Sequence, residues 1–238
     1  MYRLEFSIKE NGSSEINPDI DAEDVNNRKD YFDNNIYDTF IQPEPFFNDL
    51  KFFKSVTEEN EPTILNDAHG WAGQYPYMGW HFPVSERLKD ILEDHQLVRS
   101  RFYPGSLNFQ GKAYNYFVFH TLRNGWEYVI NFQQSIFTEW KSTGSGIVDL
   151  NQIKISSLVE FNIESKKMRN ESKEKYGIRH TIGPKEIHFS QEVDLIFLPV
   201  IRYVVSERLK QAVEKANISG LEFIPITDVD FYYQGEKL

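Results

Sequence analysis

A six-residue phrase occurs twice in this chain of 238 residues, and it constrains the fold more than any other feature. The residues Val84-Ser85-Glu86-Arg87-Leu88-Lys89 return 121 positions later as Val205-Ser206-Glu207-Arg208-Leu209-Lys210. Extending that offset without gaps over positions 84 to 104 gives 9 identities in 21 positions. Agreement of this kind within one chain predicts that a structural unit is repeated.

Each copy of the phrase has the local signals of a strand that leads into a helix. An apolar segment ends at Ser85 in one copy and at Ser206 in the other. A serine hydroxyl accepts a hydrogen bond from a free amide in the first helical turn, so both serines are predicted N-caps. Apolar residues then recur at helical spacing, and a second apolar strand follows. We therefore predict strand–helix–strand units at 80–104 and 201–225.

The rest of the chain predicts an α+β protein with a mixed or antiparallel sheet. A first strand is expected at about 2–9, and an acidic helix at 24–40. Alternating segments at 113–122 and 126–132 flank Asn124-Gly125, a dipeptide typical of hairpin turns. Residues 163–176 favour a helix. Two later segments, 185–189 and 195–199, read as strands.

Negative charge is concentrated at the start of the chain. Residues 1–62 hold 15 Asp and Glu against 6 Lys and Arg, while the whole chain has a net charge of −10. We interpret 1–62 as an acidic N-terminal region of the same domain, and 63–238 as the α+β domain that contains both repeated units. An acidic segment of this kind repels nucleic acid and attracts basic protein surfaces. A solvated loop that only keeps the chain soluble is the alternative.

The repeated phrase, together with Gly220-Leu221-Glu222-Phe223 after its second copy, resembles the C-terminal signature of a bacterial immunity-protein family. Members of that family, formerly a domain of unknown function, accompany polymorphic toxins. The resemblance covers roughly residues 80–225, and includes the aromatic segment 114–122 and Asn131-Phe132. The acidic first quarter and the basic stretch 164–185 depart from the family pattern.

The resemblance implies a cytoplasmic protein that is not an enzyme and that neutralises a cognate protein toxin, encoded by a neighbouring gene, through a non-covalent interface. It implies no catalytic residues, metal or cofactor. The acidic segment and the aromatic loop 67–82 are the candidate contacts with the toxin, since Trp is enriched at binding hot spots. Packing on the core and stacking on a sugar are the alternatives for the aromatic loop. The candidate partner-binding residues are Asp19, Asp21, Glu23, Asp24, Asp30, Asp33, Trp71 and Trp80.

Other classes of function have weaker signals. The chain has no cysteine and 6 histidines, none of them at a recognised metal-ligand spacing. Asp228 and Asp230 would serve a sugar- or nucleotide-acting enzyme that uses a divalent ion, although such triplets are frequent by chance. The basic stretch 164–185 is interrupted by glutamates, which favours a solvated helix over a nucleic-acid surface. No apolar run is long enough to cross a membrane. A scaffolding protein without a toxin partner is the remaining alternative.

Overall fold

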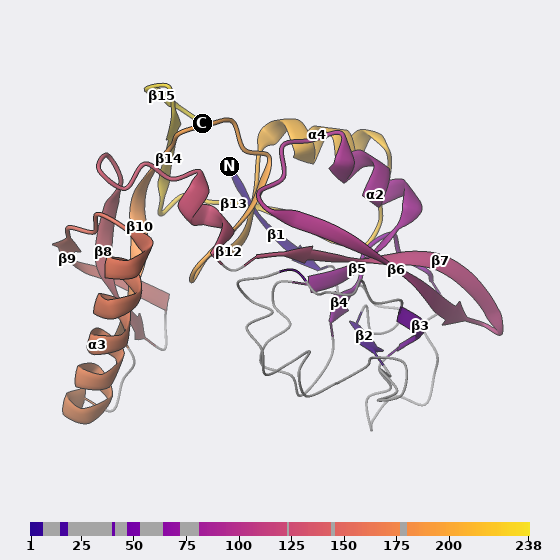
Figure 1. Cartoon of the computed structure of the whole chain (residues 1–238), viewed down its shortest axis with the longest axis horizontal. Helices are drawn as coiled ribbons and strands as arrows, with labels where there is room; N and C mark the ends of the chain where they lie inside the picture. The colour runs from indigo at the N-terminus through magenta and orange to yellow at the C-terminus, as the bar shows by residue number, and fades with distance from the viewer. Residues whose placement is uncertain are drawn as a thin grey trace.

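The computed structural model describes residues 1–6, 15–18, 40, 47–52, 64–71, 81–122, 124–143, 146–176 and 180–238. This part of the chain forms an α+β structure with three α-helices and three mostly antiparallel sheets, which confirms the predicted fold class (Figure 1). No helix in these ranges is both long and apolar enough to cross a membrane.

The first sheet has the strand order β11-β12-β1-β13. β1 lies in its centre and is antiparallel to both β12 and β13. Its partners come from the last quarter of the chain, so the first residues close the C-terminal part of the fold. The strands are β1 (Tyr2–Phe6), β11 (Leu195–Leu198), β12 (Arg202–Val205) and β13 (Leu221–Pro225).

The second sheet has the order β4-β2-β3-β6-β7-β5. Here β7 is antiparallel to both β6 and β5, while β3 is parallel to β6. The strands are β2 (Glu15–Pro18), β3 (Phe47–Phe52), β4 (Gly70–Trp71), β5 (His81–Ser85), β6 (Ser100–Phe109) and β7 (Lys112–Thr121).

The third sheet has the order β15-β14-β10-β8-β9 and packs against the long helix α3, at the left of Figure 1. β10 is antiparallel to β8 and parallel to β14. The elements are β8 (Ile136–Thr143), β9 (Gly146–Ile153), α3 (Leu158–Tyr176), β10 (His180–Phe189), β14 (Asp230–Tyr233) and β15 (Glu236–Lys237).

The hairpin predicted around Asn124-Gly125 is wrong. β7 pairs along its whole length with β6, which precedes it, and residues Gly125–Tyr128 form a 3-10 helix, η1. The turn between β6 and β7 consists of Gln110 and Gly111, whose φ angles are +49° and +74°. Positive φ at both central residues is the geometry that joins two strands in a two-residue hairpin. The sequence Gln-Gly signals it less strongly than Asn-Gly, which explains the misassignment.

Two short helices lie in contact beside the first two sheets, α2 (Glu86–Glu93) and α4 (Glu207–Lys215) (Figure 1). Both begin as predicted, because the Oγ atoms of Ser85 and Ser206 accept hydrogen bonds from the amides of Leu88 and Leu209. Each helix buries its leucine side against the sheets and exposes its charged side.

The β11–β12 hairpin separates two hydrophobic cores. Leu195, Tyr203 and Val205 belong to the core under α2 and α4, whereas Ile196 and Val204 belong to the core of the third sheet and α3. Because side chains alternate along a strand, each strand of the hairpin contributes to both cores. The turn of this hairpin lies beside α3, at the site described next.

Candidate functional site

The turn between β11 and β12 has an unusual backbone. Val200 and Arg202 have φ angles of +72° and +77°. The amide of Ile201 donates to the carbonyl oxygen of Pro199 at 2.9 Å, across a single residue. This is a γ-turn with positive φ at its central residue, a rare and strained form. The left-handed region costs an L-residue about 1–2 kcal/mol, and it is especially unfavourable for β-branched valine. Strain of this kind is concentrated at functional sites.

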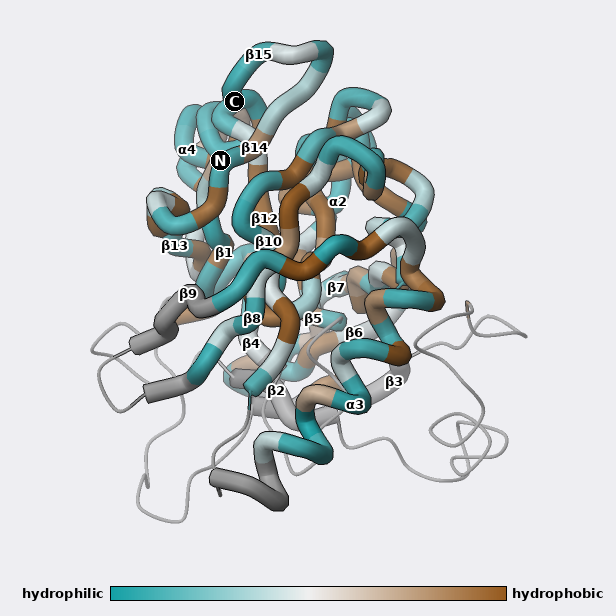
Figure 2. Tube along the Cα trace, turned by 90° about the vertical axis from the view of Figure 1, so that its left-hand side faces the viewer, coloured by the Kyte–Doolittle hydropathy of each residue, from teal (hydrophilic) through white to brown (hydrophobic). Residues whose placement is uncertain are grey.

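The helix α3 forms the opposite wall. Its first turn is fixed by Ser157, whose Oγ accepts from the amide of Glu160 at 3.2 Å. The Glu160 carboxylate accepts in return from the amide and the hydroxyl of Ser156. These bonds satisfy backbone groups that a helix start leaves free. Seen as a whole, α3 is mostly hydrophilic and lies at the edge of the molecule (Figure 2).

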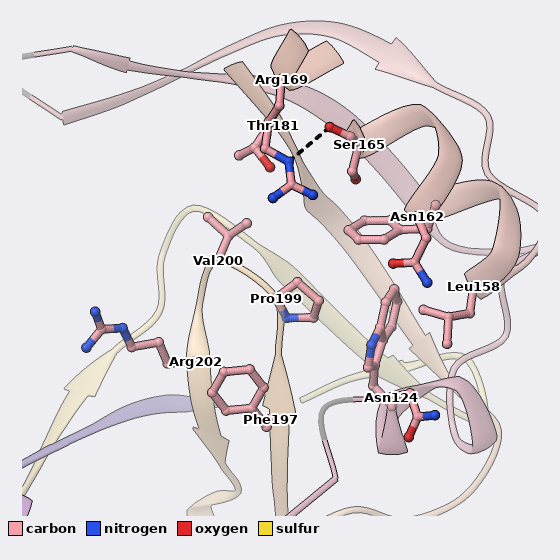
Figure 3. Close-up of a pocket in the computed structure, with 12 residues that line it drawn as sticks. Asn124, Leu158, Asn162, Ser165, Arg169, Thr181, Phe197, Pro199, Val200 and Arg202 are labelled. Atoms are coloured by element: carbon pink, nitrogen blue, oxygen red, sulfur yellow. Dashed lines mark hydrogen bonds between the residues drawn. The ribbon is translucent and has the colours of Figure 1, made fainter. Parts of the chain in front are cut away.

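A pocket of about 740 Å³ lies between this wall and the turn. Its floor is apolar and includes the buried side chains of Trp126, Phe161 and Phe197. The rings of Trp126 and Phe161 meet edge to face, with centroids 4.9 Å apart. The described residues that line the pocket are Asn124, Trp126, Leu158, Phe161, Asn162, Ser165, Arg169, Thr181, Phe197, Pro199, Val200 and Arg202 (Figure 3).

Two polar atoms of this lining are buried and have no hydrogen-bond partner among the described residues. They are the Oγ atom of Ser165, a residue only 4 % exposed, and the Oδ1 atom of Asn124. Burying a polar group without a partner costs free energy, so such atoms are uncommon in folded proteins. Both atoms therefore have hydrogen-bonding positions that a bound group could use.

The charge of the pocket is opposite to that of the chain. Its described lining contains Arg169 and Arg202 but no Asp or Glu, while the whole chain carries −10. Neither arginine forms an ion pair with a described residue. The Arg169 Nε donates to the carbonyl oxygen of Ser165 at 3.2 Å, and its guanidinium points into the space between α3 and the turn (Figure 3). The site is thus suited to an anionic group.

Apolar side chains are exposed on the same segments. Among the described residues, the exposed large hydrophobic side chains include Val159 at 65 %, Ile163 at 59 %, Tyr128 at 55 % and Val200 at 40 %. Tyr128 belongs to η1, Val159 and Ile163 to α3, and Val200 to the turn, and each of these segments also lines the pocket. We call these four residues the apolar rim.

The described lining of the pocket contains none of the predicted partner-binding residues. Trp71 lies in β4, but the position of its side chain is outside what the structure describes. The remaining predicted contacts, like the helix expected at 24–40, lie outside the described residues; these contacts are Asp19, Asp21, Glu23, Asp24, Asp30, Asp33 and Trp80. They stay predictions.

The predicted catalytic alternative is placed at the C-terminal end. Asp230 forms an ion pair with Lys237, with Oδ1 and Nζ 2.6 Å apart, and Asp228 is exposed. Within the described ranges, no group of three His, Asp or Glu residues is arranged to hold a metal ion.

The capping serines of the repeated phrase each bind a buried carboxylate that sequence reasoning missed. The Ser85 hydroxyl donates to Asp67 Oδ1 at 2.7 Å, and the Ser206 hydroxyl to Asp194 Oδ1 at 2.5 Å. Burial opposes the ionisation of Asp194, but hydrogen bonds from Arg208, Ser206 and the Gln96 amide outweigh it and lower the pKa of its carboxyl group. These contacts anchor the helix starts, as expected for structural caps.

No known protein family matches the chain, and no curated protein does. The pocket also had no clear signal in the sequence, because its lining comes from four separate segments between 124 and 202. In the sequence, Arg169 is one of several basic residues of the stretch 164–185. The closest signal was Pro199-Val200, since a proline that ends a strand indicates a turn.

Proposed function

We propose that this protein binds and neutralises a cognate bacterial protein toxin in the cytoplasm, through a non-covalent interface and without chemistry of its own. The resemblance of residues 80–225 to an immunity-protein family is the first support. The observation that carries the proposal is the apolar rim. Exposed apolar side chains on segments that also line a pocket are candidates for a protein-binding surface, where a few contacts supply most of the affinity.

We further infer that the two units of the chain are repeats of one design. Support comes from the strand pairing: β5 and β6 both pair antiparallel with β7, and β12 and β13 both pair antiparallel with β1. Each unit thus has its helix between two strands that share a central neighbour. The contacts of Asp67 and Asp194 agree with this. Their Oδ2 atoms accept the amides of Ser219 and Gln96, each from the loop after the other unit's helix, at 3.1 and 2.8 Å.

Two surfaces divide the work in this proposal. The acidic segment, with Asp19, Asp21, Glu23, Asp24, Asp30 and Asp33, speeds the encounter with a basic toxin surface, because long-range attraction mainly raises association rates. The apolar rim makes the close contact and slows dissociation. Charge reversal at the six acidic positions should therefore lower the association rate and its salt dependence.

A rescue experiment tests the proposal. The open reading frame next to this one is expressed in a permissive host with and without the protein, and surviving cells are counted. We expect growth to stop without the protein and to return with it. A neighbouring product that is harmless alone, or that kills regardless of this protein, would refute the proposed function.

Substitutions then test the rim itself. Ile163→Ser removes an exposed apolar side chain from the rim, and Ile224→Ser removes one from β13, a strand that does not line the pocket. We expect I163S to weaken toxin binding about tenfold, as for a moderate hot spot, and I224S to leave it unchanged. Equal affinities of the two variants would place the interface elsewhere.

A further inference from the structure

We propose that the pocket between α3 and the β11–β12 turn binds a small ligand that carries a planar aromatic ring and an anionic group. This inference goes beyond toxin neutralisation and does not depend on it. It rests on the shape of the pocket, its unpartnered polar atoms, its charge and the backbone of its turn.

The apolar floor fits a flat ring. Pockets for small ligands commonly have volumes of about 300–1,000 Å³, and are lined by aromatic side chains with a few polar groups. The volume of about 740 Å³ lies within that range, and Trp126, Phe161 and Phe197 supply the aromatic surface. Stacked or edge-to-face contacts with these rings would hold a planar group at the floor.

The polar atoms add direction. The Ser165 hydroxyl can donate and accept, and Asn124 Oδ1 is an acceptor; neither has a hydrogen-bond partner in the described part of the chain. They come from different walls, since Ser165 belongs to α3 and Asn124 precedes η1. A ring with polar atoms at its edge would satisfy both, whereas a plain hydrocarbon would leave both unpaired.

The anionic group is assigned from the arginines. The Arg169 guanidinium has no carboxylate partner among the described residues and points into the pocket (Figure 3). A guanidinium binds a carboxylate or a phosphate through paired N–H groups. Arg202 adds a second positive charge at the strained turn, and the lining described here contains no acidic residue to compete.

The strained turn gives a reason for this position. Val200 and Arg202 hold left-handed φ angles next to the pocket, in a hairpin whose two strands are packed on both faces. Packing on both sides fixes the turn, so the wall of the pocket is rigid before a ligand arrives. A wall that is already in place loses little freedom on binding.

Calorimetric titration of the full chain with two sets of probes tests the proposal. Adenosine 5′-monophosphate and indole-3-acetate are the anionic probes, and adenosine and indole-3-acetamide are their neutral counterparts. We expect at least one anionic probe to bind tenfold or more tightly than its counterpart. Preference for the nucleotide would identify phosphate as the natural anion, and preference for indole-3-acetate would identify carboxylate. If neither anionic probe binds more tightly than its counterpart, the proposal is wrong.

Two variants on α3 distinguish specific binding in the pocket from non-specific attraction of the anionic probe to positive charge. Arg169→Gln removes a charge that lines the pocket, while Lys167→Gln removes an equal charge from α3 outside the lining. We expect R169Q to weaken binding of the preferred probe about tenfold and K167Q to leave it unchanged. Equal weakening by both would overturn the proposal. Ser165→Ala is the second pocket variant, and it should weaken binding without changing the preference for the anion. Toxin rescue is measured separately, so failure of one proposal leaves the other intact.

Discussion

Asp194 and Arg208 are joined by two hydrogen bonds, although one residue is buried and the other is half exposed. Arg208 donates from Nε to Oδ1 at 3.1 Å and from Nη2 to Oδ2. The Asp194 side chain is 1 % exposed, and it also accepts from the Ser206 hydroxyl and the Gln96 amide. One carboxylate therefore ties β11 to the start of α4 and to the loop that follows α2.

We expect Asp194→Asn to be strongly destabilising. The change replaces one carboxylate oxygen with an NH₂ group and removes the negative charge. Arg208, Ser206 and the Gln96 amide then have fewer acceptors for their N–H and O–H groups. Breaking a buried pair of this kind costs about 3 kcal/mol of unfolding free energy. Urea unfolding at neutral pH measures it. The control is Glu192→Gln, the exposed partner of Arg208, which should cost less than about 1 kcal/mol.

The same carboxylate predicts a pH dependence. Because the folded state lowers the pKa of Asp194, its contribution to stability is present above the pKa of an unfolded aspartate, about 3.9, and is lost as the pH falls through the folded value. Wild-type stability should therefore drop below about pH 4 more steeply than that of D194N. Parallel curves for the two proteins in this range would contradict the assignment.

Both helices that begin at the repeated six-residue sequence are predictable from the sequence, but these carboxylates are not. Ser85 and Ser206 were predictable caps because capping depends on neighbours along the chain. Asp67 and Asp194 lie 18 and 12 residues before their serines, at spacings that differ between the copies. They reach the helix starts only because their segments pair beside β5 and β12, where Ala68 faces Val84 and Leu195 faces Val205. Such contacts depend on tertiary structure.

The pocket shows the same limit for function. The candidate contacts predicted from the sequence are charged and aromatic segments near the N-terminus, because clusters of one residue type can be recognised from the sequence alone. The pocket is instead lined by single residues such as Asn124, Ser165 and Arg169, and no local sequence pattern distinguishes any of them. What unites them is the packing of α3 and a hairpin turn onto one core. Local patterns contain no information about that arrangement.

His81 predicts a second pH dependence, at higher pH. Burial lowers the pKa of its imidazole well below the usual value of 6.5, and the nearby His120, whose ring is stacked at 4.0 Å, lowers it further. The unfolded chain then binds more protons than the folded one below about pH 6.5, so stability is lost as the pH falls through that value. His81→Phe should reduce this slope, by up to about 1.4 kcal/mol per pH unit. Urea titrations between pH 7.5 and 5 measure it, and an unchanged slope in H81F would refute the assignment.

Gly183 is required by the aromatic core of the third sheet. A Cβ atom at this position of β10 would overlap the indole of Trp140 on β8. Gly183→Ala should therefore cost about 3 kcal/mol of unfolding free energy, as for a strongly overpacked core. Gly111→Ala is the matched control, because a Cβ there meets nothing and only the φ of +74° is unfavourable, at about 1 kcal/mol. Thermal unfolding of both variants separates overlap from backbone strain; equal losses would show that Trp140 moves aside.

The strain in the β11–β12 turn predicts the sign of the change in unfolding free energy when Val200 is replaced by glycine. Val200→Gly removes a left-handed β-branched residue, which relieves about 1–2 kcal/mol in the folded state. Glycine also increases the freedom of the unfolded chain, which offsets about 0.5–1 kcal/mol of that gain. We therefore expect V200G to be as stable as the wild type or up to about 1.5 kcal/mol more stable. Val159→Gly is the control, because it replaces another exposed valine, within α3. It should lower stability by several tenths of a kcal/mol, since glycine is a poor helix former. Urea unfolding measures the change in unfolding free energy of both variants. A gain in V200G with a loss in V159G would establish the strain. A loss in V200G as large as that in V159G would show that the turn is not strained.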